Sequence, residues 1–336
     1  MITMALFGCG RIGRMHARNI VLHPGARLAA VYDVHGPSAE AVAQEHGCTA
    51  AGSVDAILGD ATIDAVLIAS STDTHADLLE ASAKAGKAVF CEKPIDLDLA
   101  RVNACAAAIA DCAVPIQIGF NRRFDPGHRA ARQALQKGEI GALHQVIITS
   151  RDPEIPLRAY LESAGGLMRD MTIHDFDLAR FMLGEEPEEV FAIAGALGDP
   201  ELGAALGGEV DSAMIIMRTT SGRMCHINNS RNAVYGYDQR VELYGDNGMV
   251  ISGNRKPHEL QRYGGTMTEA SEPCLYFFIE RYAEAFTAEL DAFIGAVESK
   301  SACEVGFEDG RRALMLAEAA YLSLAERRMV RVSEIG

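Results

Sequence analysis

The sequence lacks the positive surplus that is typical of proteins that bind nucleic acid or anionic membranes. Its 336 residues include 31 Lys and Arg against 46 Asp and Glu, which gives a formal net charge of −15. A surface this acidic repels phosphate groups, so nucleic acid and anionic lipid are poor partners. The charge balance gives no positive information about a substrate.

The sequence also lacks the patterns of disulfide frameworks, metal sites and membrane spans. Its eight cysteines are scattered without a CxxC pair, and it has no HExxH motif and no Cys/His cluster. We therefore expect free thiols in a reducing compartment and no bound metal. No apolar run approaches the ~18 residues of a membrane span, and the first run, residues 2–7, is too short for a signal peptide. We expect a cytoplasmic protein.

The first third of the chain contains short apolar strands that alternate with helices. Strand-like runs lie at 2–7, 28–33, 65–69, 88–91 and 115–119, with helical segments at 14–22, 38–46, 77–85 and 97–110. This order is typical of βαβ units around a parallel sheet that is buried on both faces. It predicts an α/β fold with a Rossmann-type dinucleotide-binding domain over residues 1–121.

The remainder, residues 122–336, has a different pattern and predicts a second α/β domain. Strand-like runs follow one another at 144–150, 189–196, 213–219, 223–229, 239–244 and 249–252, with a helix near 170–183 and long helical stretches at 278–297 and 307–325. Consecutive strands without intervening helices favour an antiparallel or mixed sheet. We expect residues 198–208 to form a mobile loop.

A glycine-rich turn follows the first predicted strand. Residues 8–13 read Gly8-Cys9-Gly10-Arg11-Ile12-Gly13, a GxGxxG pattern between a strand and a helix. The pattern alone is common, but this position in the first βαβ unit makes it a strong dinucleotide fingerprint. The pyrophosphate would lie at the helix N-terminus, where free N–H groups and the helix dipole favour an anion.

The end of the second predicted strand indicates which dinucleotide is bound. Asp33 lies 20 residues after Gly13, and the next residues are Val34, His35 and Gly36, with no arginine. A carboxylate here can accept hydrogen bonds from the adenosine ribose and would repel a 2′-phosphate. Both features favour NAD over NADP, and a flavin is a lesser alternative because it shares the fingerprint.

Two further strand ends supply candidate cofactor contacts. Ser70, Ser71, Thr72 and His75 follow the strand-like run 65–69, at the edge of the sheet where α/β proteins bind ligands. The same loop can also cap the helix that follows.

The motif Glu92-Lys93-Pro94 follows the run 88–91, which makes Glu92 and Lys93 candidates at the same edge. A lysine there can stabilise the charge that develops on a hydroxyl oxygen as its proton leaves. Alternatively, Lys93 is simply solvated.

The second domain contains a candidate acid–base pair. Asp170 and His174 are four residues apart, which would place them on one face of a single helix. Histidine titrates near neutral pH and suits a general base for hydroxyl oxidation, while a carboxylate beside it would stabilise the imidazolium. An ordinary surface pair, or Asp170 as a helix N-cap, is the alternative.

These motifs, in this order and spacing, resemble the glucose–fructose oxidoreductase/inositol dehydrogenase/rhizopine-catabolism family over essentially the whole chain. The inositol dehydrogenase branch is the most similar, on the segments 119–125, 151–153, 171–177 and 235–238. The resemblance implies a Rossmann domain followed by an α/β domain with a large, open, mostly antiparallel mixed sheet. Such sheets commonly pack on a partner's sheet, so it also implies a homo-oligomer, either a dimer or a tetramer.

The resemblance further implies an NAD-dependent enzyme that oxidises a ring hydroxyl of a cyclic polyol to a ketone, with myo-inositol as the leading substrate and 2-keto-myo-inositol as the product. His174 would be the base, Asp170 its partner, and Lys93 the residue that polarises the substrate oxygen. Side chains with many directional donors and acceptors would read the remaining hydroxyls: Arg123, Asp152, Tyr235 and Tyr237, together with Lys93, Asp170 and His174.

Two positions depart from the family pattern. Ser150 stands where a larger polar residue is expected, and Arg169 stands beside Asp170 where an apolar residue is frequent. They leave the reaction type unchanged, but other family substrates, such as scyllo-inositol, aldoses and anhydrosugars, stay open. A non-catalytic NAD-binding regulator is the alternative from another class, and the acidic charge and the lack of a DNA-binding segment argue against it.

Overall fold

A computed structural model describes residues 1–336, which form two units. The first comprises Met1–Asn121 and Ala285–Leu314, and the second comprises Arg122–Glu284 and Met315–Gly336. The contiguous second domain predicted over 122–336 is therefore wrong in one respect, because residues 285–314 belong to the first unit. The reason is packing, since Leu290 and Phe293 are buried in the core of the first unit.

The first unit is built on a six-stranded parallel sheet with the strand order β3-β2-β1-β4-β5-β6. Its strands are short, and the central β1, β4 and β5 are almost fully buried, as predicted for a sheet covered on both faces. The strands are β1 (Ile2–Phe7), β2 (Ala26–Tyr32), β3 (Thr49–Ala50), β4 (Ala65–Ile68), β5 (Ala88–Cys91) and β6 (Ile116–Ile118).

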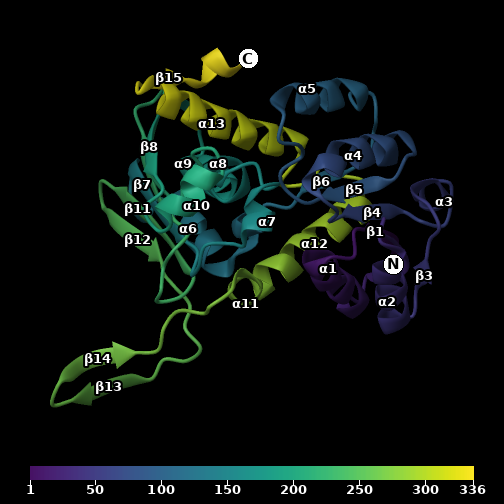
Figure 1. Ribbon diagram of the computed structural model, residues 1–336, viewed down its shortest axis with the longest axis horizontal. Coiled ribbons are helices and arrows are strands. Elements are labelled where there is room, and N and C mark those ends of the chain that lie inside the picture. Colours follow the sequence, from purple (N-terminus) through teal and green to yellow (C-terminus); the bar gives the residue numbers. More distant parts are fainter. The chain divides into compact units, whose positions relative to one another are not determined.

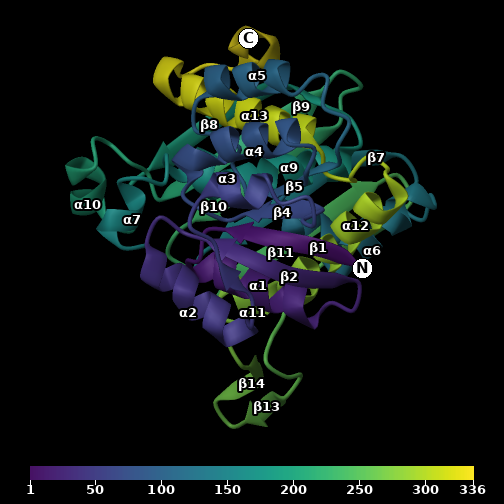
Figure 2. The same ribbon diagram turned by 90° about the vertical axis from the view of Figure 1, so that its right-hand side faces the viewer.

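Helices α1 and α2 lie beside β1 and β2 (Figure 2) and share one core with α12. The helices associated with the first unit are α1 (Arg11–Leu22), α2 (Gly36–His46), α3 (Val54–Leu58), η1 (Thr72–Thr74), α4 (His75–Lys84), α5 (Leu99–Ala108), α12 (Ala283–Ser299) and the first part of α13 (Phe307–Glu326). Because β2 and β4 flank β1 on opposite sides, the strand order reverses at β1, where such sheets bind ligands.

The second unit is built on a seven-stranded mixed sheet with the order β12-β11-β7-β10-β9-β8-β15. Only β7 and β10 pair in parallel. The predicted fold class is confirmed. The strands are β7 (Leu143–Arg151), β8 (Pro187–Gly195), β9 (Ser212–Thr219), β10 (Met224–Ser230), β11 (Asp238–Gly245), β12 (Gly248–Ser252) and β15 (Val330–Arg331).

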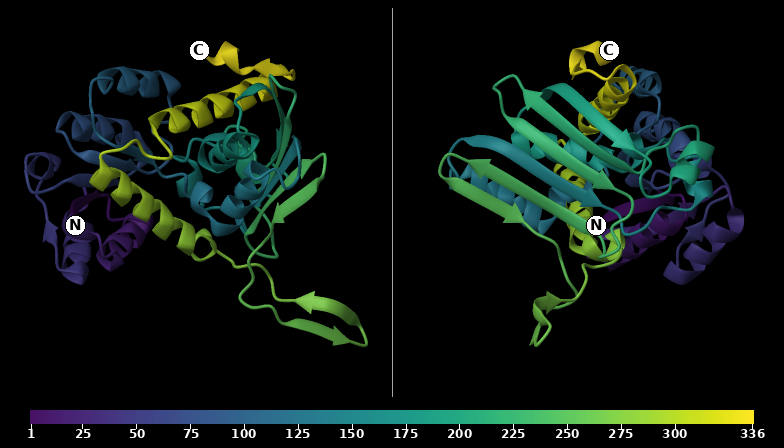
Figure 3. Two further views of the ribbon diagram at one scale, coloured as in Figure 1. Left: turned by 180° about the vertical axis from the view of Figure 1, so that it is seen from behind. Right: turned by 60° about the vertical axis from the view of Figure 1, so that its left-hand side comes forward.

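One face of this sheet carries helices and the other carries none (Figure 3, right). The buried helix α9 packs against β7 and β10 on the covered face. The helices of this unit are η2 (Asn121–Phe124), α6 (Pro126–Gln136), α7 (Arg158–Leu161), α8 (Leu167–Asp170), α9 (Thr172–Leu183), α10 (Pro200–Ala205), α11 (Phe278–Arg281), the rest of α13, and η3 (Val332–Ile335).

Two segments of the second unit differ from the sequence-based predictions. Residues 200–205 form a helix rather than a loop, because Pro200 starts it and the Asp199 carboxylate caps it by accepting the Leu202 N–H at 2.9 Å. A hairpin of β13 (Gln261–Gly264) and β14 (Met267–Ser271) was not predicted and extends away from the sheet (Figure 1). Its strands are exposed, so they lack the apolar alternation that marks a buried strand.

No helix of the structure combines the length and the apolar character that a membrane crossing requires.

Candidate functional site

The glycine-rich loop has the geometry of a dinucleotide cradle. Gly8 has φ +94°, and a Cβ there would lie 2.4 Å from the Ala69 carbonyl oxygen. A Cβ at Gly13 would lie 1.9 Å from the Gly8 oxygen, so the chain's own packing requires both glycines. A Cβ at Gly10 would meet no protein atom within 4 Å. Gly10 therefore leaves open space at the backbone, as a bound pyrophosphate needs.

The helix that follows the loop presents its N-terminus to the same space. Gly10 is the N-cap of α1, no side chain caps the helix, and its first turn has no acidic residue. Arg11 and Ile12 are the first residues of α1. Helices leave their first N–H groups without intrahelical acceptors, and these groups attract anions. The residues present therefore fit the predicted cofactor.

The carboxylate of Asp33 is fixed next to this loop. Its Oδ2 accepts the Cys9 N–H at 2.7 Å and its Oδ1 accepts the His35 N–H at 2.8 Å. Each oxygen retains a further lone pair, with which it can accept a hydrogen bond from a ribose hydroxyl. The carboxylate lies beside the glycine-rich loop, and its predicted role in selecting NAD stays a prediction.

The loop after β4 is held in place by its own side chains. The hydroxyls of Ser70 and Thr74 hydrogen-bond at 2.7 Å, and the Thr74 hydroxyl also donates to the Ser71 carbonyl. In the buried His75 ring, Nδ1 lies 2.8 Å from the Pro94 carbonyl oxygen and Nε2 lies 3.1 Å from the Ser70 carbonyl oxygen. Burial lowers the pKa of His75. His75 therefore joins the loops after β4 and β5, and its predicted cofactor contact stays a prediction.

Glu92 and Lys93 follow β5. The Glu92 carboxylate makes a 2.7 Å hydrogen bond with Nε2 of the buried His16. Buried Glu289 contributes a second carboxylate to this group. One ring nitrogen of His16 and one carboxylate oxygen each of Glu92 and Glu289 lie within 4.8 Å of one another. Lys93 lies in the first unit, whereas Asp170 and His174 lie in the second.

The predicted acid–base pair is not on one continuous helix. Asp170 is the last residue of α8, and His174 lies in the first turn of α9, so the helix predicted over 170–183 is interrupted at Met171. The hydrogen-bond spacing changes at this point. The Asp170 N–H donates to the carbonyl four residues earlier, that of Gly166, whereas the His174 N–H donates to the carbonyl three residues earlier, that of Met171.

The Asp170 carboxylate belongs to a side-chain network within the second unit. Its Oδ1 accepts from the Tyr160 hydroxyl at 2.7 Å and its Oδ2 accepts from Arg231 Nη2 at 2.9 Å. Arg231 Nη1 lies 4.0 Å from Asp152 Oδ2, so the guanidinium lies between two carboxylates. Burial raises the pKa of Asp152 to about 6, and Arg231 opposes the shift. Arg231 thus joins Asp152 and Asp170 in one network, and their contact with substrate stays a prediction; Tyr160 and Arg231 are not among the predicted site residues.

Arg123 and its neighbour Arg122 form buried ion pairs with helix α9. Arg123 Nε donates to Asp177 Oδ2 at 2.7 Å, and its Nη2 donates to the other Asp177 oxygen. Arg122 pairs with Asp175. Burial raises the pKa of Asp175, and the charge of Arg122 opposes this increase. Arg123 thus anchors α9, and its predicted contact with substrate stays a prediction.

The two predicted tyrosines differ in environment. The Tyr235 hydroxyl donates to Asp238 Oδ2 at 2.7 Å and accepts from Arg151 Nη1 at 2.8 Å, while the ring is partly exposed. Tyr237 is buried, and its hydroxyl lies 3.5 Å from Arg122 Nη2. The exposed edge of Tyr235 is therefore the more accessible to a ligand.

The two departures from the family pattern have structural partners. The Ser150 hydroxyl is buried and accepts from Arg122 Nη1 at 3.2 Å and from Gln239 Nε2 at 3.1 Å. Arg169 is bidentate with Glu318, with Nη2 2.9 Å from Oε2. Both residues thus stabilise the second unit.

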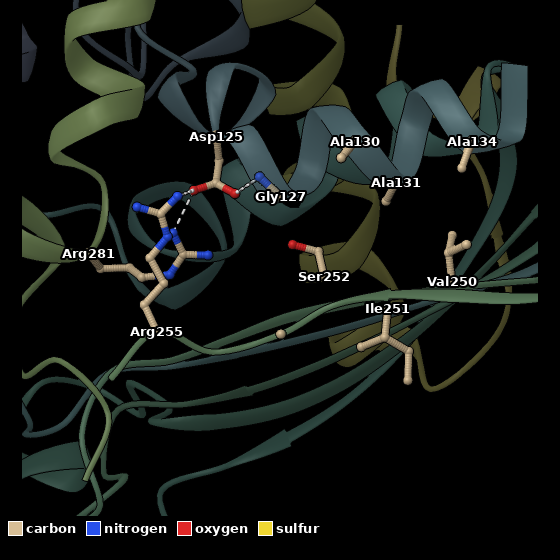
Figure 4. Close-up of a pocket in the computed structure, with 11 residues that line it drawn as sticks. Asp125, Gly127, Ala130, Ala131, Ala134, Val250, Ile251, Ser252, Arg255 and Arg281 are labelled. Atoms are coloured by element: carbon tan, nitrogen blue, oxygen red, sulfur yellow. Dashed lines mark hydrogen bonds and ion pairs between the residues drawn. The ribbon is translucent and has the colours of Figure 1, made fainter. Parts of the chain in front are cut away.

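A hollow of about 330 Å³ between α6 and β12 is a separate feature of the second unit (Figure 4). Asp125 closes one end, where it pairs with Arg281 and lies 3.8 Å from Arg255. Alanines of α6 and the apolar Val250 and Ile251 line the remainder. None of the predicted site residues lines this hollow.

Comparison with known proteins supports the sequence-based resemblance. Residues 2–120 match the model of an oxidoreductase family described as an NAD-binding Rossmann fold, and residues 128–251 match the GFO/IDH/MocA C-terminal domain. The first 120 residues are therefore an NAD-binding domain.

Three relatives match nearly the whole chain. An inositol 2-dehydrogenase of Rhizobium meliloti is 46% identical over 333 residues, which is 99% of both chains. A myo-inositol 2-dehydrogenase of Thermotoga maritima is 42% identical over 335 residues, again 99% of both. The structure of scyllo-inositol dehydrogenase from Lactobacillus casei with bound NAD(H) and scyllo-inositol is 30% identical, with a TM-score of 0.91 over 99% of both chains. The chain therefore belongs to the GFO/IDH/MocA family of NAD-binding oxidoreductases.

Proposed function

We propose that this protein is an inositol 2-dehydrogenase that oxidises myo-inositol to 2-keto-myo-inositol with NAD. The observation that carries the proposal is the 46% identity to an inositol 2-dehydrogenase over 99% of both chains. The cradle at Gly10 and the carboxylate of Asp33 support NAD as the oxidant, because Asp33 would repel the 2′-phosphate of NADP.

The first unit supplies the cofactor contacts in this proposal. The backbone at Gly8, Gly10, Arg11, Ile12 and Gly13 binds the pyrophosphate, and Asp33 binds the adenosine ribose. The loop residues that follow β4 and β5 line the nicotinamide half: Ser70, Ser71, Thr72, His75, Glu92 and Lys93.

The chemistry requires removal of a proton from the hydroxyl oxygen and of a hydride from the carbon that bears this hydroxyl. When it is bound, NAD supplies the hydride acceptor. His174 takes the hydroxyl proton, and the Asp170 charge stabilises the resulting imidazolium. Lys93 donates a hydrogen bond to the substrate oxygen and stabilises the negative charge that develops there. The proton passes from His174 to water after the ketone leaves.

The remaining ring hydroxyls need directional partners from the second unit. Asp152 and Tyr235 are the best placed of the predicted residues, since Asp152 is partly exposed and one edge of Tyr235 is open. Tyr237 and Arg123 are more buried and serve mainly to hold α9 and the neighbouring strands, with substrate contact as an additional role.

We also propose a homo-oligomer, a dimer or tetramer, in which the uncovered face of the sheet packs on a second copy. Strands β9 and β12 expose several apolar side chains, including Met214 (50% exposed) and Ile251 (58%). Exposed apolar area of this kind marks protein interfaces.

The eight cysteines are all unpaired thiols, which supports a reducing compartment such as the cytoplasm.

Oxidation of scyllo-inositol is the second candidate, favoured by the fold similarity to the Lactobacillus casei enzyme. The test is NADH formation at 340 nm with myo-inositol, scyllo-inositol, D-chiro-inositol, glucose, xylose and levoglucosan, each with NAD and NADP. We expect the highest kcat/KM for myo-inositol with NAD. Preference for scyllo-inositol would move the assignment to the second candidate, and activity only with an aldose or anhydrosugar would contradict both.

A further inference from the structure

Arg231 is an arginine buried between two carboxylates, and neither its position nor its role was predicted from the sequence. It follows β10, its side chain is 2% exposed, and its own N–H donates to the Asp211 carbonyl at 2.8 Å. Nη2 lies 2.9 Å from Asp170 Oδ2, and Nη1 lies 4.0 Å from Asp152 Oδ2. The Arg231 guanidinium therefore lies beside two carboxylates, Asp152 and Asp170, that come from different parts of the chain.

The sheet register creates this arrangement. The strands β10 and β7 are parallel, with Ser230 opposite Arg151, so the next residues, Arg231 and Asp152, emerge at the same edge of the sheet. The Asp152 N–H donates to the Ser230 carbonyl at 2.8 Å and continues this pairing. Asp170 reaches the same edge from the end of α8.

The second oxygen of Asp170 is also held, because the Tyr160 hydroxyl donates to Oδ1 at 2.7 Å. Burial and the Asp170 charge raise the pKa of Tyr160, so this phenol remains a hydrogen-bond donor throughout the neutral range. Asp170 thus has both oxygens engaged by donors, and its direction is fixed before substrate binds.

We propose that Arg231 is a positioning residue that fixes Asp170 for His174 and keeps Asp170 and Asp152 ionised together. The inference rests on the polyol oxidation proposed above. It assigns to Arg231 a role that no sequence motif indicated, acting through the two carboxylates rather than on the substrate itself.

The charges around the pair explain why a guanidinium is needed. Two neighbouring carboxylates disfavour joint ionisation, so one of them takes up a proton unless a cation balances them. Asp152 already titrates with a pKa of about 6, raised first by burial and further by the charges of Asp170 and Asp175, against the opposing effect of Arg231 and Arg122. Glu209 adds another acid that interacts with both Arg231 and Asp170.

Loss of the guanidinium would place a proton on the carboxylate pair near neutral pH. Protonated Asp170 would no longer stabilise the His174 imidazolium, which lowers kcat. Protonated Asp152 would offer one acceptor fewer to a substrate hydroxyl, which raises KM for the polyol. The loss should therefore depend on pH, unlike the effect of a purely structural defect.

The test compares Arg231→Met and Arg231→Lys with the wild type, by kcat/KM for myo-inositol with saturating NAD from pH 5.5 to 9.5. We expect the acidic limb of the profile to move up by about one pH unit or more in Arg231→Met. Near pH 6.5 the loss should be roughly 10- to 100-fold and should shrink as pH rises. The lysine variant should shift less, and added methylguanidine should partly reverse the shift in Arg231→Met.

Two controls keep the result specific. Arg218→Met removes an exposed arginine of the same sheet, paired with Glu189, and should leave the profile unchanged. Tyr160→Phe removes the other donor to Asp170 and should move the acidic limb in the same direction by a smaller amount. If Arg231→Met does not fold, the test is made with Arg231→Lys and Tyr160→Phe.

The outcomes separate this inference from the proposed function. A wild type that oxidises no inositol would remove the proposed function, and the role of Arg231 with it. An active wild type with unshifted acidic limbs in the folded variants would overturn the positioning role alone. A uniform loss at every pH would also overturn it, since that result indicates only a structural defect.

Discussion

The two units build their proposed sites from different parts of the polypeptide. In the first unit, the proposed site consists largely of backbone. Its loop can turn only with glycine at Gly8 and Gly13, and the space for a ligand lies beside Gly10. In the second, the site is a network of side chains, with Arg231 between Asp170 and Asp152. A substitution that changes shape should therefore disable the first site, and one that changes charge should disable the second.

The largest expected effect is on the second unit, from His174→Ala. Loss of the base should lower kcat by roughly 10²- to 10⁴-fold. NAD affinity should persist, because the cofactor loop belongs to the other unit. Steady-state kinetics and NAD titration measure both, with His258→Ala, an exposed histidine outside the predicted site, as the control. Unchanged turnover would remove His174 as the base.

A matched pair of glycine variants tests the first unit. Gly13→Ala should lower the free energy of unfolding by about 1–3 kcal/mol, because its Cβ would lie 1.9 Å from the Gly8 oxygen. Gly10→Ala should change it by less than about 0.5 kcal/mol, yet weaken NAD binding by roughly tenfold or more, since the methyl group takes the ligand's space. Urea unfolding without NAD and NAD titration separate the two. Normal NAD binding by Gly10→Ala would contradict the cradle.

The first unit contains a buried carboxyl group, that of Glu289, which lacks a positive counter-charge such as Arg231 provides for Asp170 in the second unit. Glu289 is fully buried, neither carboxylate oxygen has a hydrogen-bond partner, and burial together with the Glu92 charge raises its pKa well above the usual 4.5. Glu289→Met should therefore raise the free energy of unfolding at pH 8 by about 1–3 kcal/mol.

This effect should depend on pH with a definite sign. A carboxyl with a raised pKa in the folded state disfavours folding as pH rises above 4.5, so the gain from Glu289→Met should be larger at pH 8 than at pH 5. Unfolding of Glu298→Met, an exposed site on the same helix, is the control. A loss of stability at pH 8 would mean that the Glu289 carboxyl makes a stabilising interaction.

The smallest effect concerns cofactor choice. Asp33→Ala should weaken NAD binding by roughly tenfold and reduce discrimination against NADP, because a charged hydrogen-bond acceptor is lost. Asp33→Asn keeps the size and removes the charge, so it should change the NAD/NADP ratio more than NAD affinity itself. The ratio of kcat/KM for the two cofactors measures this, and an unaltered ratio in both variants would show that another residue selects NAD.

The same contrast explains how much the sequence could predict. The cofactor loop and Asp33 could be predicted because their spacing is local, set by two consecutive strands and by the turn and helix between them. The main strands of the mixed sheet were also predicted, from their apolar alternation.

The remainder depended on contacts between distant residues. Arg231 meets Asp152 only because β10 pairs with β7 in parallel, a register that the sequence pattern does not contain. The return of residues 285–314 to the first unit likewise depends on tertiary packing of α12. The break between α8 and α9 at Met171 carried no glycine or proline signal.

The most direct test of the account is transfer of the label from myo-inositol deuterated at C2. Incubation with NAD, followed by NMR or mass spectrometry of the reduced cofactor, reports the origin of the hydride. The account predicts deuterium at C4 of the nicotinamide, with 2-keto-myo-inositol as the other product. NADH without deuterium, or no NADH at all from a folded protein that binds NAD, would contradict it.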